Sequence, residues 1–181
     1  MKSRFVLELI INSIIILLFL GAGISVFILN QTAEEYSYIL LGTISIIVGV
    51  CKGVIYLLNG GIHNHKNVTF VTSVGMIFLG LFFFLGNKDI DTLCFGWGLM
   101  ELMIGLIEVY IDILETSEGK KTAPFEMMVN IGSIVFAILL CIKTGDGLKA
   151  HLIFLSISLV LNALIHASTI YKTIKERKNN D

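Results

Sequence analysis

Four acidic side chains interrupt an otherwise apolar segment at residues 95–115, and ionisable groups inside a membrane are rare and tend to mark ion or proton pathways. They are Glu101, Glu108, Asp112 and Glu115. At about 100° per residue the three glutamates fall on one stripe of a helix, with Gly98 and Gly105 on the adjacent stripe. Small residues permit close helix packing, so we expect this face to point into a helix bundle.

The composition places these acids in a membrane protein. The chain has 181 residues, of which 55% are hydrophobic and 15% charged, against about 25% charged in a typical soluble domain. A bilayer core needs roughly 20 apolar residues per helix. We predict an all-α fold, a single transmembrane domain over residues 1–181, with six spans at about 5–29, 36–58, 68–86, 92–114, 124–142 and 150–171.

Lysine and arginine predict the orientation. With six spans both termini share a side, and nine basic residues fall on that side against three in the opposite loops, Lys52 being left within the second span. The positive-inside rule then puts both termini in the cytoplasm. The basic tail after residue 170 determines topology more readily than it recognises lipid.

The helices also indicate three tandem two-helix repeats. With an offset of 56 residues, Gly42, Ser45, Gly49 and Lys52 of the second span align with Gly98, Glu101, Gly105 and Glu108 of the fourth. LELIIN at 7–12 and FEMMVN at 125–130 share a Glu and an Asn, and FVTSVG at 70–75 can be laid over both. Two-helix units insert the same way up, which predicts a pseudo-threefold axis along the membrane normal.

Five polar side chains from five spans fall at one depth, roughly 8 to 10 Å inside the cytoplasmic ends at 1.5 Å per residue. They are Asn12, Lys52, Glu108, Asn130 and His166. We expect Lys52 to pair with Glu108 or to extend to the interface, and Glu101, nearer the midplane, to be protonated or hydrogen-bonded. For Glu8, Asp112, Glu115 and Glu126, near the span ends, solvation by water and headgroups is expected.

Few features suggest a metal, a cofactor or catalysis. Cys51, Cys94 and Cys141 lack paired spacing, and His63-x-His65 offers only two ligands, so no metal or cofactor site is predicted. Neither a nucleophile beside a base nor a phosphate-binding loop is evident. A net charge of −1 gives no reason to expect nucleic acid, which leaves the lipid bilayer as the expected partner and any substrate unknown.

Six short spans in three two-helix units, small residues spaced by seven and GLMELMIG at 98–105 resemble the HdeD-like family of acid-resistance membrane proteins. The resemblance implies a non-enzymatic inner-membrane protein for acid or stress tolerance and supplies no catalytic residues. A small proton-linked transporter or channel using the intramembrane polar residues is the main alternative. A homo-oligomeric structural or effector protein is a third.

Overall fold

The computed structural model of the chain is all-helical over the residues it describes, which are 2–28, 33–58, 66–86, 90–117, 123–142 and 148–180. Its helices are α1 (Lys2–Ile28), α2 (Ala33–Leu58), α3 (Lys66–Leu85), α4 (Ile90–Ser117), α5 (Ala123–Cys141) and α6 (Leu148–Asn180). Pro124 is the second residue of α5, within the first turn, where a missing N–H costs nothing.

All six helices are long and apolar enough to cross a membrane, which confirms the predicted spans. Large apolar side chains also cover the outer surface of the bundle, as Leu17, Phe78 and Met103 illustrate, so the fold is that of a multi-pass membrane protein. The ends differ from prediction mainly in α6, which continues nine residues beyond Tyr171. Charged residues ended the predicted span there, but charge does not end a helix that has left the apolar layer.

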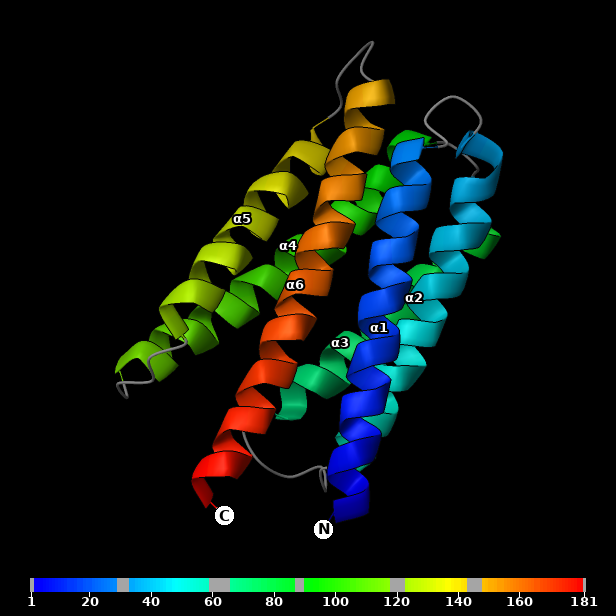
Figure 1. Cartoon of the computed structure of the whole chain (residues 1–181). Helices are drawn as coiled ribbons and strands as arrows, with labels where there is room; N and C mark the ends of the chain where they lie inside the picture. Colours follow the sequence, from blue (N-terminus) through cyan, green and yellow to red (C-terminus); the bar gives the residue numbers. More distant parts are fainter. Residues whose placement is uncertain are drawn as a thin grey trace.

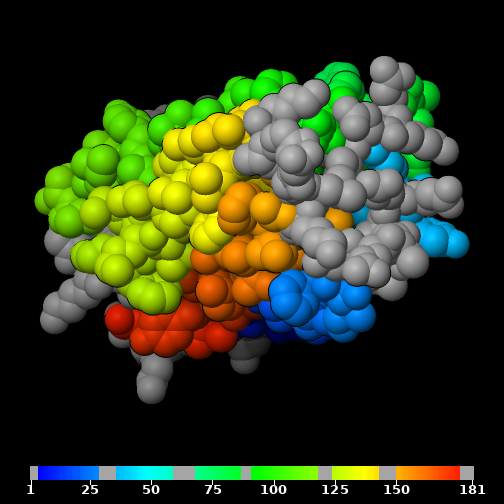
Figure 2. Space-filling model, turned by 90° about the horizontal axis from the view of Figure 1, so that it is seen from above, coloured from blue at the N-terminus to red at the C-terminus, as the bar shows by residue number. Residues whose placement is uncertain are grey.

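The helices form a closed ring in which close and looser pairings alternate. The closest pairs are α2 with α3, α4 with α5, and α6 with α1, and each of these is joined to the next by looser contacts. Seen from the end opposite to the termini, α5 and α6 lie side by side, with α4 along the outer edge of α5 (Figure 2). Both termini lie at one end, and there α4 and α5 lean away from α6 and α1 (Figure 1).

Glycines set the spacing of the close pairs. A Cβ atom on Gly49 of α2 would lie 2.8 Å from the backbone oxygen of Ser73 in α3, and one on Gly98 of α4 would lie 2.8 Å from that of Ala137 in α5. The Ser73 hydroxyl also donates a 2.7 Å hydrogen bond to the backbone oxygen of Gly49. Backbones can approach this closely only where the side chain is absent.

The tightest apolar packing lies in the half of the bundle away from the termini. Trp97 is almost fully buried there and meets Phe19 edge to face, with ring centroids 6.3 Å apart. Leu155 and Leu159 of α6 are fully buried in the same cluster. This packed half closes the bundle above the polar residues described next.

Candidate polar cavity between the helices

Two adjoining cavities, of about 280 Å³ and about 190 Å³, open between the helices in the half of the bundle that holds the termini. Glu108, Thr69 and Ile165 are among the residues that line both, so we treat them as one polar cavity. All six helices contribute to its walls. Its charged side chains are Glu8, Glu108, Asp112, Glu115, Glu126, Lys52 and Lys172. Among the described residues, five carboxyl groups against two lysines make the cavity lining acidic when all are ionised.

The structure brings the five residues of the predicted polar layer to this cavity. Asn12, Lys52, Glu108 and His166 line its smaller part, and Asn130 lines the larger part together with Glu108. Their common depth follows from the predicted spans, whereas their common cavity follows from how the six helices pack.

Lys52 and Glu108 face the same cavity, but no ion pair joins them among the described side chains. They lie close enough for their charges to attract each other. The direct ion pair, the first of the two expectations for Lys52, is therefore absent, and a gap within the cavity lining lies between the two groups. Such a gap leaves room for water or a small ion to mediate between them.

His166 is held between a polar and an aromatic neighbour. Its Nδ1 lies 3.2 Å from Oδ1 of Asn12, and the tautomer that carries the hydrogen on Nδ1 donates to that oxygen. The Asn12 amide in turn donates a 3.1 Å hydrogen bond to the backbone oxygen of Glu8. On its other side the imidazole stacks on Phe19 with ring centroids 5.9 Å apart. His166 thus sits where the cavity meets the packed half.

Glu101 lies deeper than the cavity and is fully hydrogen-bonded, as the second of the two expectations for it required. Its Oε1 accepts a 2.6 Å hydrogen bond from the Ser133 hydroxyl of α5, and the Asn162 amide of α6 donates to both oxygens at 2.7 and 2.8 Å. Ser158, one turn before Asn162, accepts a 3.2 Å hydrogen bond from Trp97. Ser133 and Asn162 are both uncharged, and each donates to the carboxyl oxygens of Glu101.

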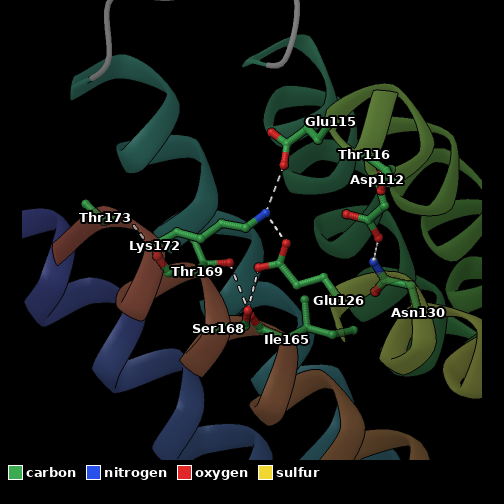
Figure 3. A network of polar contacts seen from close by, with 10 residues as sticks. All are labelled: Asp112, Glu115, Thr116, Glu126, Asn130, Ile165, Ser168, Thr169, Lys172 and Thr173. Carbon is green, nitrogen blue, oxygen red and sulfur yellow. Dashed lines mark hydrogen bonds and ion pairs between the residues drawn. The ribbon is translucent and has the colours of Figure 1, made fainter. Parts of the chain in front are cut away.

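A second polar cluster was not expected from the sequence. Asp112 and Glu126 lie inside the bundle, with 5% and 8% of their surfaces exposed, so the expectation that they are solvated at the headgroup layer is wrong for these two. Asp112 accepts a 2.7 Å hydrogen bond from Asn130. Lys172 bonds Glu115 at 2.9 Å and also forms an ion pair with Glu126, which accepts a hydrogen bond from Ser168 (Figure 3). Only the observed course of α6 past residue 171 reveals Lys172 as their partner.

The two histidines of the His63-x-His65 segment lie outside the described residues. No protein-family model, curated protein or solved structure matches the chain. The resemblance to the HdeD-like family therefore stays a prediction, and the functional argument depends on the geometry of the chain's own side chains.

Proposed function

We propose that this multi-pass membrane protein is a small proton-linked transporter or channel whose path begins in the polar cavity and reaches Glu101. The observation that carries the proposal is a cavity walled by all six helices and lined by ionisable side chains. Intramembrane ionisable groups that face a cavity rather than lipid are the usual elements of proton and ion paths.

The spacing of the acids supports such a path. Glu101 lies seven residues before Glu108 on the same stripe of α4, or about 10 Å deeper in the bundle at 1.5 Å per residue. Protons arriving through the cavity would meet Glu108 first, with His166 on the facing helix, and Glu101 next. Beyond Glu101 lies an apolar layer formed by Trp97, Phe19 and Leu155. This layer would block the proposed path, so transport must open it as a gate.

We also infer that three two-helix units build the bundle. The alternation of close and looser helix pairs around the ring supports this, as do equivalent glycine contacts. Gly49 faces the backbone oxygen of Ser73, and Gly105, its counterpart in the sequence alignment, faces that of Asn130 at 3.8 Å. These contacts favour Ser73 as the counterpart of Asn130, two residues from the register in which FVTSVG was laid over FEMMVN.

The physiological role that the resemblance implies, tolerance of acid or stress without enzymatic activity, is compatible with a protein that moves protons, and we retain it as a proposal. We propose that the protein lies in the inner membrane with both termini on the cytoplasmic side, because the basic residues concentrate at that end of the helices. Protons would then reach the cavity from the cytoplasm.

Proton flux in proteoliposomes tests the proposal. Purified protein is reconstituted with an entrapped pH dye, a pH gradient is imposed with the membrane potential clamped, and Glu101→Gln and Glu108→Gln are run beside the unmodified chain. Asp91→Asn is the matched control, because it makes the same carboxyl-to-amide change on α4 outside the cavity. We expect flux above that of empty liposomes, lost in both glutamate variants and kept in the control.

Two results would contradict the proposed path. Flux that persists in both glutamate variants would place the route elsewhere. No flux across the acidic range would argue against proton conduction and would favour the oligomeric structural role, which crosslinking in native membranes can examine.

A further inference from the structure

Three carboxyl groups gather at one wall of the larger cavity. Asp112 and Glu115, three residues apart on α4, face Glu126 at the start of α5, and one oxygen from each lies within 4.8 Å of the others (Figure 3). Residues three apart on a helix share a face, so both acids of α4 point the same way. At a metal–oxygen distance of about 2.3–2.6 Å, two oxygens bound to one Ca²⁺ lie up to about 5 Å apart, so these three can share that ion, whereas the shorter bonds of Mg²⁺ require them to draw closer.

Asn130 adds a fourth oxygen, which has no hydrogen-bond partner among the described residues. It lies one turn after Glu126 on the same face of α5, lines the same cavity and is 3% exposed. Its amide nitrogen donates to Asp112, while its Oδ1 has no hydrogen-bond partner. A buried carbonyl oxygen without a donor is unfavourable, so its place beside three carboxyl groups favours a ligand that binds oxygen.

The net charge of the cluster also favours a cation as its ligand. Three ionised carboxylates and the Lys172 ammonium sum to a formal −2, so one divalent cation would bring the group to zero. Asp112 and Glu126 are largely removed from water. An uncompensated charge at such a place is costly.

We propose that Asp112, Glu115, Glu126 and Asn130 form a binding site for a hard divalent cation of the Ca²⁺ or Mg²⁺ class, with Lys172 as a tethered competitor. Oxygen-only ligands select this class over softer metals. In the structure the ammonium of Lys172 bonds Glu115 and Glu126 and so neutralises part of the site. A cation would displace it, and the flexible lysine stem can turn toward the end of the bundle that holds the termini.

The site goes beyond the proposed proton path, because equilibrium binding requires neither flux nor an open gate. The sequence did not predict it, since its ligands come from two helices and none has the spacing of a metal motif. Proton flux and cation binding can therefore fail separately.

Mn²⁺ titration in detergent tests the site, because free Mn²⁺ has a sharp electron paramagnetic resonance signal that is lost on binding, and competition then ranks Ca²⁺ and Mg²⁺. The full chain is compared with Asp112→Asn, Glu126→Gln, Asn130→Ala and Lys172→Met. Asp91→Asn is the matched control for Asp112→Asn, since it makes the same change at the other end of α4. Thermal unfolding of each variant with and without Ca²⁺ accompanies the titration.

We expect one Mn²⁺ per chain, displaced by Ca²⁺ or Mg²⁺. Loss of a carboxylate ligand should weaken binding at least about tenfold, and loss of the Asn130 oxygen should weaken it less. Lys172→Met should bind more tightly and become more dependent on Ca²⁺ for its thermal stability. The control should match the unmodified chain.

The opposite results would overturn the site. If neither the unmodified chain nor Lys172→Met binds Mn²⁺ at millimolar concentration, the cluster is a structural ion pair alone. Binding that Asp112→Asn and Glu126→Gln leave unchanged would place the ion elsewhere. Weaker binding in Lys172→Met would show that the lysine supports the site and does not compete for it.

Discussion

In the half of the bundle near the termini, carboxyl groups, amides, two lysines and His166 face inward around cavities of about 280 and 190 Å³. In the other half the helices turn Phe19, Trp97, Leu155 and other apolar side chains inward, where they are almost fully buried. Apolar side chains can fill a space of any shape, because contact alone stabilises them. Polar side chains need partners at set distances, so a region built from them tends to stay hollow and hydrated.

The junction between the halves shows how one passes into the other. Glu101 joins α4 to α5 and α6 through Ser133 and Asn162, and Trp97, four residues before it, turns its indole N–H to Ser158 and its ring to Phe19. One turn of α4 thus separates a polar network from an aromatic layer. If the two halves differ in this way, substitutions in the packed half should mainly lower stability, whereas positions in the polar half should differ mainly in their access to water.

The largest effect is expected from Trp97→Ala in the packed half. Removing this side chain leaves a cavity that rigid neighbours cannot fill and strips Ser158 of a donor, which should cost about 3–5 kcal/mol in unfolding free energy. Phe95→Ala is the matched control on the same helix, because Phe95 is half exposed on the outer surface. Thermal or denaturant unfolding in detergent measures both. Equal losses would show that the packed half is not tighter than the surface.

A smaller effect is expected at the helix contacts that hold the halves together. Gly49→Ala would place a methyl group against the Ser73 backbone and the Ile77 side chain, so α2 and α3 must move apart, at about 1–3 kcal/mol. A Cβ atom on Gly21 meets nothing within 4 Å, so Gly21→Ala should be neutral or slightly stabilising through helix propensity. The same unfolding measurement compares them. A Gly49→Ala chain as stable as the Gly21→Ala chain would argue against the close contact.

The smallest effect is expected in a comparison that measures the access of water to the two halves and not the stability of the protein. In a chain with Cys51, Cys94 and Cys141 replaced, Thr69→Cys in the cavity should react with a membrane-impermeant thiol reagent, whereas Ser45→Cys, fully buried on α2, should not. Labelling of residue 69 only from the cytoplasmic side would support the proposed orientation. Labelling only from outside would reverse it, and equal reaction at both positions would remove the contrast between the halves.

The sequence predicted the helices because span length and apolar composition act locally. Each span needs enough apolar residues to cross the bilayer, so its bounds can be read one segment at a time, and α1 to α5 follow the prediction within about three residues. The depth of Asn12, Lys52, Glu108, Asn130 and His166 was predictable for the same reason, since a fixed rise per residue sets it.

The partners of these residues were not predictable in that way. Lys52 and Glu108 share a depth and yet form no ion pair, because the distance between them depends on how α2 and α4 are placed in the bundle. Lys172 was assigned to the tail, but its helix continues and brings it to Glu115 and Glu126.

The sequence alone thus determined that six apolar helices carry acids on one face of the fourth and a polar layer at one depth, because hydrophobicity and helical periodicity are properties of single segments. Only the tertiary structure decided that Glu101 is hydrogen-bonded by Ser133 and Asn162, that the polar layer surrounds a cavity, and that Asn130 donates to Asp112 while its Oδ1 has no partner among the described residues. Those outcomes depend on the rotation and tilt of one helix against another, which close contacts such as that of Gly49 with α3 set and no single segment encodes.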